Sequence, residues 1–230
     1  MSSVPPLAVP TNQVWPSRAA SMIRAIRMFD QPIHALEIGT WFGEGSTQIW
    51  LDNLPEGSTL TLLDPWRPYC SAADMADPGF NYAAVDAQVL EAYLATILAV
   101  RKFENAHPGR VTVDIVRGDS ERVMARMRDA IFDFIYIDGD HKYESVRQNL
   151  RDAKRLARND IALICGDDLE HLPSPELLAV ARDFKDRDFL RAPHHFHPGV
   201  MLAVDEELGR VGMQDGFWWV FKKYGQFTPD

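Results

Sequence analysis

The sequence predicts an α/β fold, a doubly wound and mostly parallel sheet of seven strands with helices on both faces. Two observations lead to this prediction. Segments of strand character alternate with segments of helical period along most of the chain. Residues 132–138 and 161–166 are near-continuous apolar runs rich in Ile and Phe, which is typical of strands buried on both faces of a parallel sheet.

The first quarter of the chain supplies two helices and two strands. Ser17 is a candidate N-cap for a helix over residues 18–29, where apolar side chains recur on one face. A strand over residues 33–38 leads through a glycine-containing turn into a helix that ends near Leu51. A second strand covers residues 59–64 and ends in an acid.

A long connection follows the second strand. Residues 65–82 are rich in aromatic side chains and precede a helix over residues 84–105. We expect 65–105 to be an insertion or lid between strands two and three of a single domain that spans residues 1–230. The proline-rich residues 1–16 are expected to form an N-terminal arm.

The second half of the chain repeats the alternation and closes with two further strands. The expected strands cover residues 111–116, 132–138, 161–166, 200–204 and 217–221. The expected helices cover residues 120–128, 143–157 and 174–184.

Composition and charge bound the function. The 230 residues carry a formal net charge of -9, which argues against a nucleic-acid partner and against an anionic membrane surface. No apolar run approaches the roughly 20 residues that span a bilayer, and the first residues lack the layout of a secretory signal. Cys70 and Cys165 lie far apart, so a reducing cytoplasm is the expected location. The chain could form a homo-oligomer, because one of Trp218 and Trp219 is expected at an edge or dimer surface.

Carboxylates cluster where two of the expected strands end. Asp138 ends the run 132–138, and Asp167 and Asp168 follow the run 161–166. Neighbouring parallel strands lie roughly 5 Å apart, so these three side chains could surround one point. Carboxylates that close repel one another unless a cation or a proton neutralises them. A hard divalent cation such as Mg²⁺, which prefers oxygen ligands, would resolve the repulsion.

Three further features follow the first three strands. The turn with Gly39 and Gly43 opens a helix, whose amino end favours a carboxylate or phosphate, but its spacing departs from the dinucleotide fingerprint. A tight structural turn is the alternative. Asp64 could accept both hydroxyls of a ribose or cap a turn. Asp119 could meet an adenine amino group or serve as the N-cap of the next helix.

In combination these motifs resemble those of class I S-adenosylmethionine-dependent methyltransferases. The matching residues are Glu37-Ile38-Gly39 with Gly43 and Ser46, then Asp64, then Gly118-Asp119-Ser120, then Phe132-Asp133 through Asp138. The resemblance covers roughly residues 33–221 and is closest to the metal-dependent O-methyltransferases that act on catechols and antibiotic sugars. It implies a Rossmann-like methyltransferase fold.

The resemblance also implies residue roles. It implies that S-adenosylmethionine is bound by Glu37, Gly39, Thr40, Gly43, Ser46, Asp64, Asp119, Ser120 and Asp138. It implies a divalent metal held by Asp138, Asp167 and Asp168. Residues 157–160 depart from the Gly-Gly turn that often precedes strand five, and Gly45 stands where catechol-type members commonly carry serine.

The expected reaction moves a methyl group to a hydroxyl of a small-molecule acceptor. A metal-bound hydroxyl has a lowered pKa, and two adjacent hydroxyls could chelate the ion, so a diol, catechol or sugar is expected. Asp140 and His141 are the candidate bases, and the family pattern does not choose between them. The alternative is that Asp140 caps the helix near Tyr143 and that His141 merely packs beneath the loop. His197, the last of a His-rich stretch, could border the site.

Three other functions compete with this one. The metal could be present without a catalytic role, or the acidic cluster could belong to a metal-dependent hydrolase. A non-catalytic cofactor-binding scaffold is the non-enzyme alternative. A hydrolase would not explain why the glycine turn, Asp64 and Asp119 occur together. A non-catalytic scaffold would not explain the acidic cluster, whose carboxylates would only repel one another.

Overall fold

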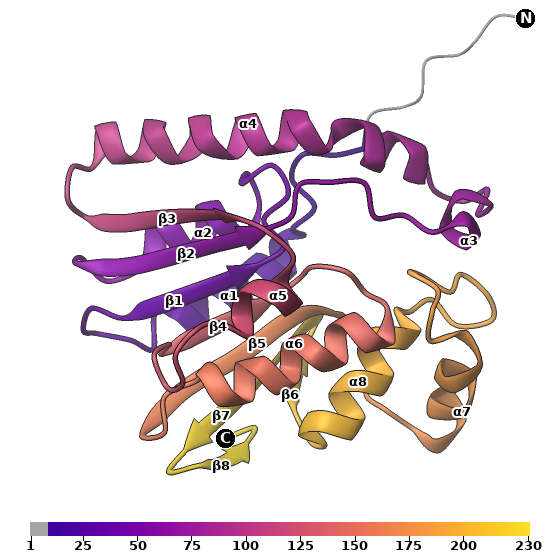
Figure 1. The fold of residues 1–230 in the computed structure, drawn as a ribbon. Coiled ribbons are helices and arrows are strands. Elements are labelled where there is room, and N and C mark those ends of the chain that lie inside the picture. Colours follow the sequence, from indigo (N-terminus) through magenta and orange to yellow (C-terminus); the bar gives the residue numbers. More distant parts are fainter. Residues whose placement is uncertain (1–8) are drawn as a thin grey trace, which may run out of the picture.

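The computed structural model describes residues 9–230 and contains one mixed α/β sheet flanked by helices (Figure 1). The strand order is β3-β2-β1-β4-β5-β7-β6, with β8 paired to β7. The strands are β1 (His34–Ile38), β2 (Ser58–Asp64), β3 (Val111–Arg117), β4 (Phe134–Ile137), β5 (Ile161–Leu169), β6 (Gly212–Gln214), β7 (Gly216–Lys223) and β8 (Gln226–Thr228). β1 to β5 pair in parallel, and β6, β7 and β8 are antiparallel. The predicted doubly wound fold is confirmed.

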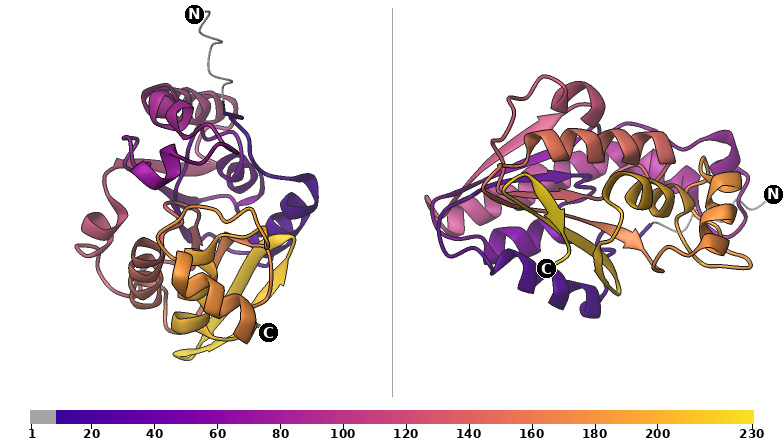
Figure 2. Two further views of the ribbon diagram at one scale, coloured as in Figure 1. Left: turned by 90° about the vertical axis from the view of Figure 1, so that its right-hand side faces the viewer. Right: turned by 90° about the horizontal axis from the view of Figure 1, so that it is seen from below.

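Helices cover both faces of the sheet (Figure 2). They are α1 (Pro16–Ile26), α2 (Ser46–Asn53), α3 (Ala72–Met75), α4 (Tyr82–Ala106), α5 (Ser120–Met124), α6 (Tyr143–Leu156), α7 (Pro175–Phe184) and α8 (Pro198–Leu208). α1, α2 and α4 pack on one face, and α5, α6, α7 and α8 lie on the other. Strand side chains alternate between the two cores, as Ala35 and Leu36 show.

The prediction of a strand over residues 200–204 is wrong, because that segment is the centre of α8. Val200 to Val204 are all buried, so the segment is apolar on every side and shows no helical stripe. A short apolar run of this kind does not distinguish a buried strand from a buried helix. The sheet nevertheless has eight strands rather than seven, because β6 and β8 are added at the end of the chain.

Smaller differences concern helix ends. Ser17 is not the N-cap of α1: Trp15 takes that position and Pro16 begins the helix, as proline often does. The short helix α3 lies inside the aromatic-rich connection, and its N-cap is Ser71, whose hydroxyl accepts a hydrogen bond from the Asp74 backbone N–H.

α4 contradicts one expectation from the sequence. By length and composition this helix of 25 residues could cross a membrane, although no such run was expected. In the described structure its inner side, with Ala92, Val100 and Phe103, packs into the domain.

The described part of the N-terminal arm lies across the turn that follows β1. The indole N–H of Trp41 donates to the Pro10 carbonyl at 3.1 Å, and the Thr11 hydroxyl donates to Glu44 at 2.6 Å. The Val9 N–H donates to Gln88 of α4 at 3.0 Å. Residues 1–8 of the expected arm lie outside the described residues.

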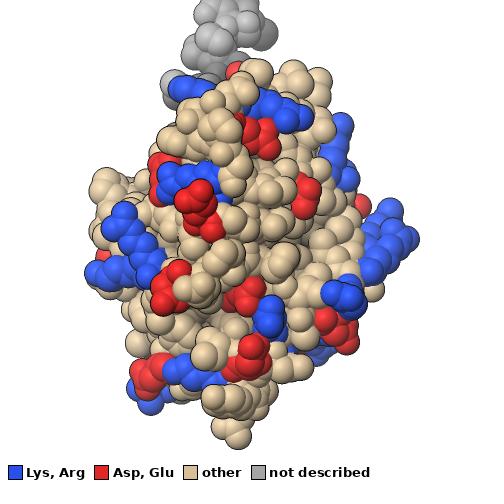
Figure 3. All heavy atoms as spheres, turned by 90° about the vertical axis from the view of Figure 1, so that its left-hand side faces the viewer, with Lys and Arg blue, Asp and Glu red and all other residues tan. Residues whose placement is uncertain are grey.

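The two edges of the parallel sheet differ in character. The side seen in Figure 3, at the amino ends of the parallel strands, shows acidic and basic side chains interspersed without a continuous basic patch. The opposite edge gathers the carboxyl ends of β1 to β5 and holds the candidate site.

Candidate functional site

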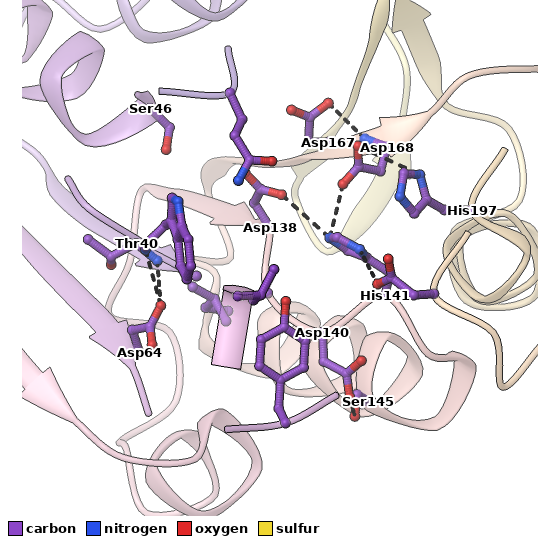
Figure 4. Close-up of a pocket in the computed structure, with 18 of the residues that line it drawn as sticks. Thr40, Ser46, Asp64, Asp138, Asp140, His141, Ser145, Asp167, Asp168 and His197 are labelled. Atoms are coloured by element: carbon purple, nitrogen blue, oxygen red, sulfur yellow. Dashed lines mark hydrogen bonds and ion pairs between the residues drawn. The ribbon is translucent and has the colours of Figure 1, made fainter. Parts of the chain in front are cut away.

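A cavity of about 720 Å³ opens at the carboxyl ends of the parallel strands (Figure 4). This volume suits a cofactor together with a small molecule. Its wall includes residues that follow each of β1 to β4 and the tip of β5 itself, as well as the arm. Of the predicted site residues, Gly39, Thr40, Ser46, Asp64, Asp119, Ser120, Asp138, Asp140, His141, Asp167 and Asp168 line it.

The turn after β1 packs tightly against the tip of β4 at Gly39. The φ of Gly39 is +84°, and a Cβ atom at this position would lie 1.8 Å from the Asp138 carbonyl oxygen. Only glycine permits this approach. Gly43, also at positive φ, packs against Thr96 of α4 and is not part of the cavity wall.

Glu37 lies beneath the turn rather than in the cavity wall. Its fully buried carboxyl accepts hydrogen bonds from the Ser46 hydroxyl and, at 2.7 Å, from the Thr47 hydroxyl, both in the first turn of α2. Burial raises the pKa of Glu37 to about 8, against the effect of these hydrogen bonds. Glu37 therefore anchors the start of α2.

Asp64 is held by backbone N–H groups. One carboxylate oxygen accepts from Thr40 at 2.9 Å and Trp41 at 3.2 Å, and the other accepts from Trp66 at 2.6 Å. Burial raises the pKa of Asp64 above its usual value. These three contacts leave acceptor capacity for a further donor from the cavity.

Thr40 offers an unused group in the same wall. Its hydroxyl is buried and has no hydrogen-bond partner among the described residues. Buried polar groups are normally hydrogen-bonded, so this position fits a polar ligand.

Asp119 lies at the outer side of the cavity. Its carboxylate pairs with the Arg67 guanidinium at 2.5 Å and does not hydrogen-bond the amino end of α5, although Asp119 has the N-cap position. Ser120 follows it as the first residue of α5.

The carboxylates at the tips of β4 and β5 are close together but have different partners. Asp138 accepts from the Tyr136 hydroxyl at 3.0 Å. Asp167 is buried and pairs with Arg18 of α1. Asp168 lies 3.0 Å from Nε2 of His141. A register shift between Gly166 and Leu169 and a φ of +65° at Asp168 place the two successive acids at the cavity.

The partners set the charge of these acids. Burial, together with Asp168 and Asp138, raises the pKa of Asp167 well above its usual value, against the effect of Arg18. Burial also acts to raise the pKa of Asp168, but the imidazoles of His197 and His141 outweigh burial, so the pKa of Asp168 is lowered. Asp168 is therefore more firmly ionised than Asp167.

His141 lies between two carboxylates. Its Nε2 faces Asp168 (Figure 4). Its Nδ1 is 2.9 Å from Asp188. Burial lowers the pKa of His141, but Asp168 and Asp188 outweigh burial and raise it well above its ordinary value. Asp188 also accepts from the Tyr82 hydroxyl at 2.7 Å.

Asp140 has both carboxylate oxygens occupied. The backbone N–H and the ammonium of Lys142 each lie 3.2 Å from one oxygen, and the Ser145 hydroxyl donates to the other at 2.9 Å. Lys142 is the N-cap residue of α6, so Asp140 organises the start of that helix from two residues before it.

A family model described as a methyltransferase domain matches residues 36–169, more than half of the chain. The chain belongs to this methyltransferase family. The match includes the glycine turn, Asp64, Asp138 and the Asp167-Asp168 pair.

Solved structures share the fold of the methyltransferase. A protein from Klebsiella pneumoniae described as an O-methyltransferase is 22% identical, with a TM-score of 0.51 over 94% of this chain and 84% of that one. One from Staphylococcus aureus described as a caffeoyl-CoA O-methyltransferase is 14% identical, with a TM-score of 0.52 over 93% and 86%. The cofactor-bound protein Rv0187 from MTB is 16% identical, with a TM-score of 0.51 over 94% and 84%. No curated protein matches the chain.

The donor set of the methyltransferase fits a divalent cation, with one difference from expectation. Ligand atoms of Asp138, His141 and Asp168 lie within 4.8 Å of one another. Among the described residues, Asp167 is in no such group, because it faces Arg18. The carboxylates of Asp138 and Asp168 remain for a cation, and the His141 imidazole lies beside them.

Sequence reasoning missed two residues of this site. Arg18 lies in α1 and Asp188 follows α7, and neither stands in a motif or at a strand end. His197 was expected only to border the site. It lies 3.7 Å from Asp168 and 2.7 Å from Glu170. The only feature of the sequence that pointed to His197 was the His-rich stretch to which it belongs.

Proposed function

We propose that the methyltransferase transfers the methyl group of S-adenosylmethionine to a hydroxyl of a small diol, catechol or sugar, beside a divalent cation. One observation carries the proposal: a single cavity joins the glycine turn and Asp64 to the acids and His141 at the tips of β4 and β5. The first part suits a nucleoside with an amino-acid tail, and the second suits a hydroxyl that must lose a proton.

The cofactor half has suitable donors and acceptors in place. Asp64 has remaining acceptor capacity for a ribose hydroxyl, and the unpaired Thr40 hydroxyl faces no protein partner among the described residues. The amino end of α2, beginning at Ser46, favours the carboxylate of the methionine part. Asp119 and Ser120 lie where an adenine would reach the outer wall.

In the acceptor half, Asp138 and Asp168 are the proposed metal ligands, with Asp167 nearby but paired to Arg18. Mg²⁺ is the proposed ion. Bound there, a divalent cation supplies positive charge that lowers the pKa of an acceptor hydroxyl.

His141 is the proposed base. Both oxygens of Asp140 are occupied, whereas Nε2 of His141 faces the cavity acids and its Nδ1 is held by Asp188. Once the charge of Asp168 is offset, His141 loses an interaction that raises its pKa, and Nε2 can accept the proton.

Aromatic residues of the connection before α4, and of the first turn of α4, form the acceptor side of the wall. Tyr69, Phe80 and Tyr82 line the cavity from within residues 65–105. We propose that this segment covers the acceptor and that an aromatic or sugar ring packs against it.

A second candidate is methyl transfer without a catalytic metal. Arg18 already offsets the charge of Asp167, and the His197 imidazole lies 3.7 Å from Asp168. In that case the same base acts on an acceptor hydroxyl of lower intrinsic pKa, such as a phenol.

Calorimetry with S-adenosylmethionine, with magnesium and then with a chelator, tests the cofactor assignment. We expect binding in both conditions, and absence of binding would overturn the proposal. Screening catechols, glycosides and polyphenols for transfer of a labelled methyl group tests the acceptor class. Turnover that survives the chelator would support the metal-free candidate.

A further inference from the structure

α4 carries a row of leucines that nothing in the described structure covers. Leu90, Leu94 and Leu98 are 58%, 52% and 69% exposed. Residues four apart lie on the same side of a helix, so the three side chains form one stripe. Contiguous exposed apolar surface of this kind marks interaction sites.

The stripe cannot turn inward, because the opposite side of α4 is fixed in the domain. Ala92, Val100 and Phe103 are buried there. The Thr96 hydroxyl donates to the Trp41 carbonyl at 3.0 Å, which ties the helix to the glycine turn. The leucine stripe is also separate from the cavity, whose wall takes Val85 and Val89 from α4 but none of the three leucines.

Charges at the two ends of the stripe are of opposite sign. Glu91 lies three residues before Leu94, and Arg101 lies three residues after Leu98. If a second α4 runs antiparallel with its Leu98 opposite Leu94, its Arg101 comes opposite Glu91. Two-fold symmetry repeats both contacts, and the dipoles of the two helices oppose one another favourably.

We propose that the stripe is a homodimer interface, in which the α4 helices of two copies pack antiparallel through Leu94 and Leu98, with Leu90 at the rim of the contact. Self-complementary charge favours a second copy over other occupants of the stripe. A bilayer is disfavoured by Glu91, next to Leu90, and by the net charge of -9. The existing Arg101–Glu104 pair at 2.9 Å is exposed and competes weakly.

Light scattering after size-exclusion chromatography, over a dilution series of the full chain, tests the dimer. We expect twice the monomer mass, and the monomer mass for Leu94→Asp. Leu172→Asp, at a leucine also 58% exposed but in the loop after β5, is the matched control and should stay dimeric. A monomeric wild type, or a dimeric Leu94→Asp, would overturn the proposal.

Charge exchange tests the antiparallel arrangement. Glu91→Arg alone and Arg101→Glu alone should each raise the dimer dissociation constant by roughly tenfold, and the double variant should restore it. A double variant no tighter than the single ones would overturn the arrangement. Circular dichroism establishes that each variant is folded.

Vesicles of neutral lipid distinguish a membrane from a second copy. Flotation of the wild-type chain with the vesicles, lost in Leu94→Asp, would overturn the dimer proposal if the wild type is monomeric in solution. These outcomes do not depend on methyl transfer, so failure of the proposed function leaves the dimer test intact.

Discussion

The two halves of the cavity hold their carboxylates in opposite ways. Beside β1 and β2, Glu37 and Asp64 receive hydrogen bonds from hydroxyl and backbone N–H groups. At the tips of β4 and β5, Asp167 and Asp168 face the side chains of Arg18 and His141. Glu37 and Asp64 are therefore held by neutral donors, whereas Asp167 and Asp168 face groups that carry charge.

The difference separates a fixed region from an exchangeable one. Backbone N–H groups are fixed by the fold, so the cofactor half exists before any ligand arrives. Arg18 and His141 come from separate segments and occupy carboxylates that a cation could take instead. Substitutions in one half should therefore leave the function of the other nearly unchanged.

The largest effect is expected at Asp168. Asp168→Asn removes a carboxylate whose pKa is lowered and which is a proposed metal ligand, so Mn²⁺ affinity measured by electron paramagnetic resonance should fall at least about 100-fold. Calorimetric affinity for S-adenosylmethionine should change little. Asp114→Asn, at an exposed position of β3, is the control. An equal loss of both affinities would break the division between the halves.

Asp64→Ala probes the other half. It leaves the N–H groups of Thr40, Trp41 and Trp66 without their acceptor, and we expect S-adenosylmethionine to bind roughly 30-fold more weakly, about 2 kcal/mol. Mn²⁺ affinity should be retained. Unchanged cofactor binding in calorimetry would contradict the ribose assignment of Asp64.

Arg18→Gln tests whether Arg18 and a cation compete for the carboxylates at the tips of β4 and β5. Asp167 would lose its cationic partner while buried, so the variant should be less stable without metal and should bind Mn²⁺ about tenfold more tightly. Arg24→Gln, on the same helix but bonded to Ser21 and Gln214, is the matched control. Weaker Mn²⁺ binding in Arg18→Gln would show that Arg18 does not compete with a cation.

The last prediction concerns protein stability rather than binding, and it follows from the pKa of Glu37. Its folded-state pKa of about 8 exceeds the ordinary 4.5, so the folded state holds a proton that the unfolded chain releases between these values. The free energy of unfolding should therefore fall as pH rises through this window, by at most about 1.4 kcal/mol per pH unit from this group.

Urea unfolding of Glu37→Gln between pH 5 and 8 measures this contribution, because Gln cannot lose the proton. The variant should gain stability relative to the wild type as pH rises. Glu56→Gln, at an exposed loop position, should show no such trend. Parallel pH profiles for wild type and Glu37→Gln would exclude the raised pKa.

The sequence was sufficient for most of the sheet because each buried strand is short, apolar and bounded by polar residues. Residues 132–138 and 161–166 became β4 and β5 for this reason. The same criterion failed for residues 200–204, where complete burial removes the helical stripe from α8. β6 and β8 are three residues each, too short to show a period.

The candidate site likewise contains residues that the sequence predicts and residues that it does not. Asp138 and Asp168 could be placed from sequence because parallel strands bring their ends to one edge. Arg18 lies 149 residues from Asp167, and Asp188 reaches His141 from beyond α7. Such contacts depend on tertiary packing, and no local sequence pattern predicts them.

Arg18 also bears on the order in which the chain can assemble. Besides Asp167, it donates at 3.0 Å to the carbonyl of Asp215, in the turn between β6 and β7. The first helix therefore reaches its final anchor only after nearly the whole chain has been synthesised. A ribosome-bound fragment that ends before β7 would contain the glycine turn and every carboxylate discussed above, yet α1 would lack this anchor. Cofactor binding by nascent chains of increasing length would then begin late, with release of the C-terminal hairpin.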